Sequence, residues 1–471
     1  MRITIIGSGP AGYTAAFEAA RRGCAVTLVE RDSLGGVCLN RGCIPTKTLR
    51  ASADAVLLAA RLAEFGVTGM GAPGIDAGAV QRRKESVISI LRTGLAKSCE
   101  RLGISRLHGA ARLRDAHTVS VRSDGEETRV EGDAVILAPG SRIRNLPGLG
   151  PDHERICDSN DALDLTEIPE SCIIVGGGVI GCELAGILSA FGSRVTVVEA
   201  QERLLPLPSV DADISTLLER EMHKRKIRML TRRTLDRVRV EDGKVRATAV
   251  PWGEGAQGDG EELEAARLFV TVGRAPDTEG LGLAEAGVRV DEHGWIGADA
   301  EFRTSVPGIC AAGDALGPGR SMLAHVAAME GLACVETLLG GHGQVDYAAV
   351  PSAIFTTPEI GCVGLTESQA RAGGEEVVCA TTLVRQLGKA HAMGELPGFF
   401  KIVASRGDGR LLGIHMAGAH ASDMLGEATL ALSLKADLWQ MASTIHAHPT
   451  LSEGLFETAR AALHELERSG A

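Results

Sequence analysis

The feature that most constrains this 471-residue chain is a motif that occurs twice. Each copy predicts a short apolar strand, a glycine turn, a helix, and a second strand that ends at a glutamate. The first copy runs from Arg2 to Glu30 and the second from Cys172 to Glu199. In both copies the glutamate lies 23 residues after the first glycine of the turn. Two ordinary strand–helix turns are the alternative, and the repeated spacing argues against it.

The two glycine turns have the form that a bound dinucleotide requires. The first glycine makes the tight bend, the second lets a pyrophosphate approach the backbone, and the third allows close packing of helix on strand. The free N–H groups and positive dipole at the helix start attract phosphate, and the acid accepts hydrogen bonds from a ribose. The residues are Gly7, Gly9, Gly12 and Glu30 in the first copy, and Gly176, Gly178, Gly181 and Glu199 in the second. We therefore predict two bound dinucleotides.

The end of the second copy indicates which nicotinamide nucleotide binds there. The Glu199 carboxylate can bind the 2′-hydroxyl of NAD and would repel the 2′-phosphate of NADP. Residues 200–203 read AQER, with a single arginine, whereas NADP sites usually carry a basic cluster. The sequence favours NAD.

Composition excludes several other classes of protein. The net charge of −11 argues against a general nucleic-acid surface. No apolar run approaches the ~20 residues that cross a bilayer, and a strand directly after Met1 leaves no room for a signal peptide. Eleven scattered cysteines do not form a secreted disulfide framework. We expect a cytoplasmic protein without nucleic-acid or membrane partners.

The rest of the chain is arranged around the two copies. Residues 69–78 and 253–262 are glycine-rich and predict exposed loops, and 340–343 predict a linker. Beyond it, strands are expected at 375–384, 399–404 and 411–416, and helices at 422–435 and 450–467. This mixture without a glycine turn predicts an α+β third domain.

Cys38 and Cys43 stand five residues apart just after the first copy. Five residues of regular helix rise ~7.5 Å, whereas the Cβ atoms of a disulfide lie only ~3.5–4.5 Å apart. A bond between them therefore needs an irregular turn, which Gly42 would permit. A strained, accessible disulfide suits catalysis. The residues alone leave three interpretations open: a redox pair, unpaired buried thiols, or metal ligands without further ligands nearby.

Several segments resemble one known family. Residues 35–47, GGVCLNRGCIPTK, are similar to the active-site signature of the class I pyridine nucleotide–disulfide oxidoreductases, and the resemblance extends over essentially the whole chain. Further matching segments are AAGD at 311–314, MLAH at 322–325, TVGR at 271–274 and PSAIFTTPEIGCVGLTE at 351–367. The chain departs from the family at Pro139, where threonine is usual, and at Asp277, where asparagine is common.

The resemblance implies an α/β fold with two Rossmann-like domains, one for FAD and one for NAD, and a C-terminal α+β dimerisation domain. The FAD-binding part would comprise 1–145 and 275–345, the second piece being a central domain. The NAD-binding domain would be 146–274 and the interface domain 346–471.

The resemblance also implies which residues contact the cofactors. Besides the two glycine turns and their glutamates, these are Gly36, Lys47, Gly109, Gly140, Ser141, Asp314, Met322, Leu323, Ala324 and His325 for FAD, and Leu235 and Gly273 for NAD. Lys47 and Glu183 would form an ion pair close to the flavin. The alternative for Lys47 and Glu183 is that each is an ordinary charged residue on a helix. The alternative for Leu235 is that it is an ordinary core residue.

The same resemblance assigns the chemistry. Cys38 and Cys43 would form a redox-active disulfide, with Cys38 as the interchange thiol and Cys43 facing the flavin. Near the C-terminus, IHAHPTLSE (445–453) is similar to a family element in which a histidine acts as acid and base across a dimer interface. That histidine is His448, placed at a helix entrance by Pro449 and oriented by Glu453, with His446 in support. A homodimer is implied.

The expected reaction is oxidation of dihydrolipoamide to lipoamide, with hydride passed through FAD to NAD⁺. Any lipoyl carrier must be a separate protein, either the E2 component of a 2-oxo acid dehydrogenase or the glycine-cleavage H protein. The alternatives are an NAD(P)H-dependent reductase of another small disulfide and a mercuric-reductase-like flavoenzyme. Mercuric reductases add a C-terminal cysteine pair, but the last cysteine here is Cys379. A non-catalytic FAD-binding subunit would not need the cysteine pair and His448.

Overall fold

The computed structural model describes residues 1–69, 71 and 73–469. The chain forms two compact units. The first comprises Met1–Leu49, Asp76–Arg144 and Gly273–Val345, and the second comprises Arg50–Ile75, Asn145–Val272 and Asp346–Ala471. The three-domain boundaries predicted from the sequence stay predictions.

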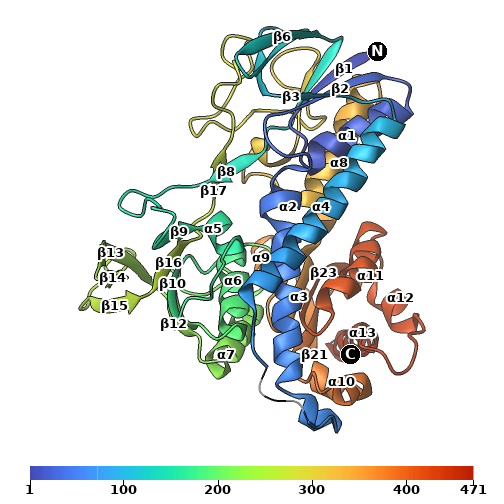
Figure 1. Ribbon diagram of the computed structural model, residues 1–471. Helices are drawn as coiled ribbons and strands as arrows, with labels where there is room; N and C mark the ends of the chain where they lie inside the picture. Colours follow the sequence, from blue (N-terminus) through green and yellow to red (C-terminus); the bar gives the residue numbers. More distant parts are fainter. Residues whose placement is uncertain (70, 72, 470–471) are drawn as a thin grey trace. The chain divides into compact units, whose positions relative to one another are not determined.

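The first unit is built around a five-stranded parallel sheet in the order β18-β7-β1-β2-β3. Its strands are β1 (Arg2–Ile6), β2 (Ala25–Glu30), β3 (Ser105–His108), β7 (Ala134–Leu137) and β18 (Ile309–Ala311). Helix α1 (Pro10–Arg21) packs against α8 (Ala324–Leu338), as Figure 1 shows. Alanines on α1 allow this close approach, and they join the apolar strands in one core. The first strand–helix–strand prediction is confirmed.

The first unit also contains the redox segment and two small antiparallel sheets. The redox segment spans α2 (Gly36–Arg41) and the start of α3 (Cys43–Ala59), and α2 contacts the long helix α4 (Ala77–Arg101). An antiparallel sheet contains β4 (Ala110–Leu113), β5 (Thr118–Ser123) and β6 (Glu126–Glu131), and β8 (Ser141–Ile143) pairs with β17 (Arg274–Pro276). The predicted loop 69–78 already enters α4 at Ala77, and Met70 and Ala72 lie outside the described residues.

The second unit repeats the parallel architecture in the order β12-β11-β10-β16-β9. Its strands are β9 (Ile156–Asp158), β10 (Ser171–Val175), β11 (Arg194–Val198), β12 (Arg228–Leu230) and β16 (Arg267–Val270), with helices α5 (Ser159–Leu163), α6 (Val179–Ala190) and α7 (Ala212–Lys224). An antiparallel sheet, β13 (Arg233–Glu241), β14 (Lys244–Pro251) and β15 (Glu261–Ala265), is joined to it. The predicted loop 253–262 ends earlier, because β15 begins at Glu261.

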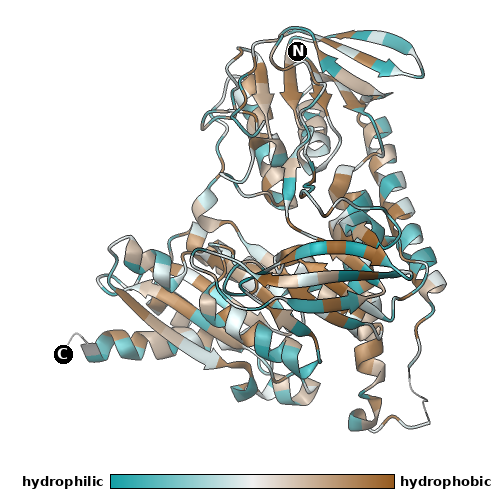
Figure 2. Ribbon diagram, turned by 90° about the vertical axis from the view of Figure 1, so that its left-hand side faces the viewer, coloured by the Kyte–Doolittle hydropathy of each residue, from teal (hydrophilic) through white to brown (hydrophobic). Residues whose placement is uncertain are grey.

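The C-terminal part of the second unit is α+β, as predicted. An antiparallel sheet has the order β19-β20-β23-β22-β21, and its strands are β19 (Ser352–Ile354), β20 (Glu359–Gly364), β21 (Val377–Leu383), β22 (Phe399–Ser405) and β23 (Leu411–Gly418). Its helices are α9 (Glu367–Ala372), α10 (Gly388–Met393), α11 (Ala421–Ser433), α12 (Leu438–Ser443) and α13 (Glu453–Ser469). Strands β22 and β23 are buried on both faces. Figure 2 shows brown, hydrophobic segments interspersed with teal, hydrophilic ones along the strands of the molecule.

One buried lysine links this antiparallel sheet to the start of helix α7, in the parallel-sheet part of the same unit. Lys401 on β22 is 6% exposed in its side chain, and its Nζ lies 3.2 Å from Asp211, 2.7 Å from Asp213 and 3.0 Å from Glu367. Asp211 also caps α7 by accepting from the Asp213 N–H. The positive charge of Lys401 therefore compensates the negative charge of the Asp211 carboxylate, which is itself only 7% exposed.

Among the described residues, no helix is both long enough and apolar enough to cross a membrane.

Candidate functional site

The first glycine turn leaves open space at its middle glycine, the position at which a pyrophosphate would approach the backbone. A Cβ on Gly12 would lie 1.8 Å from the Gly7 carbonyl oxygen, so this glycine is needed for helix–strand packing. A Cβ on Gly9 would meet nothing closer than 4.0 Å. Gly9 also stands at the N-terminus of α1, where no side chain caps the free N–H groups. The turn fits a dinucleotide phosphate.

The second glycine turn has the same construction. A Cβ on Gly181 would lie 1.9 Å from the Gly176 carbonyl oxygen, whereas one on Gly178 would meet nothing within 4 Å. No side chain caps the start of α6 at Gly178. Two turns of the same shape therefore leave open space at the same position.

The two terminal glutamates are held in the same way. Glu30 accepts hydrogen bonds from Ser8 N at 2.9 Å and Asp32 N at 2.9 Å. Glu199 accepts from Gly177 N at 2.5 Å and Gln201 N at 2.7 Å. In each case one carboxylate oxygen is fixed to the glycine turn and the other to the backbone two residues on. Each carboxylate retains accepting capacity for ribose hydroxyls.

The redox segment is irregular, as its spacing predicted. Helix α2 ends at Arg41, Gly42 adopts φ −148° and ψ −110°, and a new helix begins at Cys43. Both cysteines are thiols in this structure and are partly exposed. The hydrogen bond with the Cys43 thiol, followed by burial, raises the pKa of Cys38 well above its usual value. The break at Gly42 thus lets the two thiols form a hydrogen bond.

The predicted FAD contacts Ser141 and Asp314 share one network. The Ser141 hydroxyl donates to Asp314 Oδ2 at 2.5 Å. Arg274 donates to the Ser141 hydroxyl at 2.5 Å and to the Ser141 carbonyl at 2.6 Å. Burial lowers the pKa of Arg274, and Glu330 on α8 accepts from Gly313 N at 2.6 Å. The sequence analysis gave Arg274 only as part of the TVGR segment and missed its contact with Ser141, which arises from the pairing of β8 with β17.

The other predicted cofactor residues lie on turns and element ends. Gly36, Gly109, Gly140 and Gly273 all have positive φ. Met322 and Leu323 directly precede α8, which begins with Ala324 and His325. Leu235 on β13 packs against the apolar core that contains Val175 and Val198, which agrees with its alternative as a core residue. Its nucleotide contact stays a prediction.

Lys47 and Glu183 belong to different units, Lys47 to the first and Glu183 to the second. The Glu183 side chain is buried on α6, and its Oε1 accepts from Phe355 N at 3.0 Å. Their predicted ion pair stays a prediction.

The histidine element brings its two predicted partners together. His448 Nδ1 lies 2.8 Å from Glu453 Oε1, and the ring is largely exposed. The other Glu453 oxygen accepts from Thr450 N at 2.8 Å. That backbone bond, followed by His448, lowers the pKa of Glu453. Glu453 is therefore ionised and fixed, so it can hold the imidazole with Nδ1–H toward it and Nε2 free.

Pro449 does not start the helix, contrary to the sequence-based expectation. The His448–Pro449 bond is cis, and α13 begins four residues later at Glu453. The intervening turn is closed by Thr450, whose hydroxyl donates to the Ala447 carbonyl at 2.7 Å. The ring of His446 is buried and lies 2.7 Å from Glu427 and 3.0 Å from the Thr444 carbonyl, and its supporting role stays a prediction.

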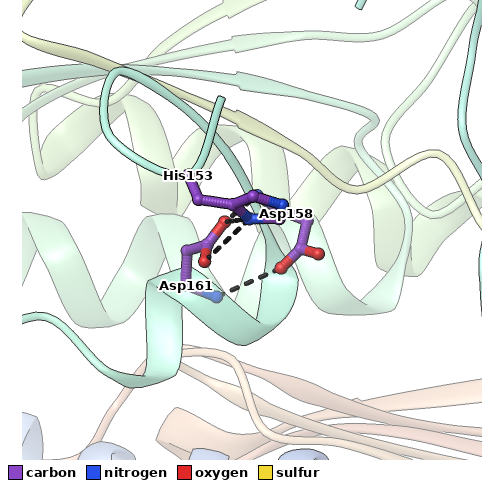
Figure 3. Close-up of side chains that lie close together, drawn as sticks. All are labelled: His153, Asp158 and Asp161. Atoms are coloured by element: carbon purple, nitrogen blue, oxygen red, sulfur yellow. Dashed lines mark hydrogen bonds and ion pairs between the residues drawn. The ribbon is translucent and has the colours of Figure 1, made fainter. Parts of the chain in front are cut away.

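A further group of polar side chains, His153, Asp158 and Asp161, is explained by helix capping (Figure 3). Asp158 caps α5 by accepting from Asn160 N and Asp161 N, and Asp161 accepts from Asp158 N at 2.8 Å. The exposed His153 ring lies 3.0 Å from Asp161. These contacts give each of the three side chains a hydrogen-bonding partner as part of the N-terminal cap of α5.

Comparison with known proteins agrees with the geometry. A family model described as pyridine nucleotide-disulphide oxidoreductase matches residues 1–331, and its dimerisation-domain counterpart matches 350–459. Dihydrolipoyl dehydrogenase of Bacillus subtilis is 39% identical over 98% of this chain and 97% of its own length. Dihydrolipoyl dehydrogenase 3 of Haloarcula marismortui is 37% identical over 97% and 95%.

Two solved structures resemble the fold closely. LpdA from Mycobacterium tuberculosis has a TM-score of 0.90 and 29% identity, covering 98% of this chain and 99% of that one. The HOCl-induced flavoprotein disulfide reductase RclA from Escherichia coli has a TM-score of 0.84 and 26% identity, with coverage of 98% and 99%.

Proposed function

The chain belongs to the pyridine nucleotide-disulphide oxidoreductase family, and from this premise we propose that it oxidises dihydrolipoamide to lipoamide and reduces NAD⁺ to NADH. It is an FAD-dependent, NAD-linked disulfide oxidoreductase. The observation that carries the proposal is the cysteine pair, whose thiols meet across the helix break at Gly42, just after the first strand–helix–strand copy.

The residues present fit both cofactors. The turn at Gly7–Gly12 with Glu30, and the network of Ser141, Arg274 and Asp314, would hold FAD. The turn at Gly176–Gly181 with Glu199 would hold NAD. FAD would supply the acceptor for the electron pair of the thiols, and NAD⁺ would supply the final hydride acceptor.

The protein's own groups carry the thiol chemistry. In the oxidised enzyme Cys38 and Cys43 form a disulfide, and His448 takes a proton from one thiol of dihydrolipoamide. The thiolate attacks Cys38, the Cys38–Cys43 bond breaks, and Cys43 leaves as thiolate. The second substrate thiol then displaces Cys38 and releases lipoamide. Cys38 receives a proton, in accord with its raised pKa, and Cys43 would be left as the thiolate that faces the flavin.

Glu453 would keep the His448 imidazole in one orientation throughout this exchange. We propose that His448 serves the cysteine pair of the partner subunit in a cytoplasmic homodimer. The lipoyl group would arrive on a separate carrier, either the E2 component of a 2-oxo acid dehydrogenase or the glycine-cleavage H protein. Lys47 and Glu183 would form their ion pair beside the flavin.

The test is NADH formation from dihydrolipoamide by the purified flavoprotein with NAD⁺, with NADP⁺ in a parallel reaction. Turnover with NAD⁺ alone supports the proposal and the role of Glu199. Cys43→Ser should retain FAD and lose turnover, and a variant that still turns over would exclude the assigned role. If the protein does not turn over dihydrolipoamide but NADH still reduces its cysteine pair, the substrate is another small disulfide.

A further inference from the structure

Asn40 lies between the two redox cysteines and uses both ends of its side-chain amide. Its Nδ2 donates to the carbonyl oxygens of Gly36 at 2.8 Å and Leu34 at 3.1 Å, with that of Ser33 at 3.4 Å as a weaker third acceptor. Its Oδ1 accepts two hydrogen bonds from Arg92, at 2.7 Å from Nη2 and 3.1 Å from Nε. We name this arrangement the Arg92–Asn40 brace.

The chemistry of the partners fixes the orientation of the amide. Carbonyl oxygens only accept and a guanidinium only donates. A flipped amide would set its NH₂ against the guanidinium of Arg92 and its oxygen against the carbonyls. The brace therefore exists in one arrangement, and it joins α2 to a helix 52 residues further along the chain.

The carbonyls that Asn40 holds belong to the segment packed on the first glycine turn. Gly35 N donates to the Ser8 carbonyl at 3.1 Å and to the Ser8 hydroxyl at 3.1 Å. A Cβ on Gly36 would lie 2.6 Å from the Cα of Gly9, so the two backbones touch. Through Asn40, the helix that carries Cys38 is tied to the turn that would bind FAD.

Helix α2 needs such support. It has six residues, far fewer than the ~12–15 at which an isolated helix becomes even marginally stable. Its flanking residues, Gly35 and Gly42, have no side chain with which to cap it. The side chain of Asn40 thus supplies contacts that the helix ends lack, and Arg92 holds that side chain in place.

We propose that Asn40 and Arg92 are positioning residues that hold Cys38 within bonding reach of Cys43. This rests on the proposed function, in which the two cysteines interconvert between dithiol and disulfide. A disulfide is more stable, relative to a reference thiol, the higher the effective concentration of its two thiols. Loosening α2 lowers that concentration, so the disulfide becomes easier to reduce.

The experiment equilibrates the FAD-loaded full chain with mixtures of reduced and oxidised dithiothreitol. Protein disulfide and dithiol reagent exchange two electrons and two protons: the Cys38–Cys43 bond breaks, two cysteine thiols form, and the reagent closes its own disulfide. Acid quenching, alkylation and mass spectrometry then give the oxidised fraction of the Cys38–Cys43 peptide. The equilibrium constant for the pair is the readout, and it does not depend on turnover.

Three variants separate the parts of the brace. Asn40→Asp keeps an acceptor for Arg92 but loses the donors to the carbonyls, Asn40→Leu loses both, and Arg92→Met removes only the support from α4. Each should favour the dithiol by about threefold or more, the factor expected for the net loss of one hydrogen bond, with Asn40→Leu giving the largest effect. Arg92→Lys, which keeps a donor, should recover part of the loss. The combined Asn40→Leu and Arg92→Met effects should be less than additive because both act through one contact.

The matched control is Lys97→Met, an exposed position on the same helix as Arg92. It should leave the equilibrium unchanged. If Asn40→Leu does not fold or loses FAD, Arg92→Met still decides the matter, because Arg92 touches neither cysteine. Folded variants whose equilibrium constants stay within twofold of wild type would refute the proposed positioning role of the Arg92–Asn40 brace. A wild-type pair that never forms a disulfide would instead overturn the proposed function.

Discussion

Replacing Lys401 by methionine tests how much of the second unit depends on one buried charge. The lysine has three carboxylate neighbours, but only Asp211 is as buried as Lys401 itself, whereas Asp213 and Glu367 are 62% and 31% exposed. Breaking a buried pair usually costs about 3–5 kcal/mol, because the remaining charge is left uncompensated. Asp211 keeps its backbone hydrogen bond from Asp213, so we expect the lower end, about 3 kcal/mol.

The assay is native-state hydrogen exchange of the amides of β22, read by mass spectrometry. It suits a chain with two units, whose unfolding need not be a single two-state transition. A loss of about 3 kcal/mol corresponds to roughly hundredfold faster exchange in strand β22. The control is Lys389→Met, a less buried lysine in the same unit.

The pH dependence gives this prediction a second readout. Burial alone would raise the pKa of Asp211, but the Asp213 N–H and Lys401 together lower it, and the hydrogen bond from Lys401 lowers that of Glu367. A lowered carboxylate pKa stabilises the fold above the unfolded values of about 3.9 and 4.3, and this stabilisation is lost as pH falls through the folded values. The difference between wild type and Lys401→Met should therefore narrow below about pH 4. An exchange rate in β22 that changes less than fivefold at pH 7 would refute the reasoning.

Three further predictions concern the cofactor turns and the base. Gly181→Ala should lower the melting temperature, because its Cβ would meet a carbonyl oxygen at 1.9 Å, whereas Gly178→Ala should leave it unchanged and only weaken NAD binding in titration calorimetry. Glu453→Gln should lower kcat by about ten- to hundredfold with FAD content unchanged, since His448 loses its charged partner; steady-state kinetics at several pH values would show it. Glu199→Ala should weaken NAD binding and improve the ratio of NADP⁺ to NAD⁺ turnover, and an unchanged ratio would contradict the assigned ribose contact.

Features encoded in short stretches of sequence could be predicted. The two strand–turn–helix units follow from local apolar periodicity and glycine spacing, and both were placed within a few residues of their observed bounds. The helix break at Gly42 also follows locally, because a regular helix cannot bring Cys38 and Cys43 together.

Features that depend on distant partners could not be predicted. Nothing near Asn40 in the sequence indicates that Arg92 will meet it, and nothing near Ser141 indicates Arg274. The error at Pro449 has a local cause. Proline suits the first turn of a helix, but here a turn closed by the Thr450 hydroxyl follows Pro449, and the helix begins only at Glu453. The antiparallel sheets β4–β6 and β13–β15 were missed, although alternating apolar residues such as Val238 and Val240 on β13 gave a local signal.

The contact of Gly36 with Gly9 has a consequence for engineering and for evolution. Because the Gly36 backbone lies against that of Gly9, a side chain at Gly36 would displace Gly9, whereas a Cβ on Gly9 would meet nothing closer than 4.0 Å. The cysteine turn therefore cannot change at Gly36 unless the cofactor turn changes with it. Residues 35–47 transplanted onto an unrelated scaffold would carry two cysteines but would lose the surface that sets the distance between them.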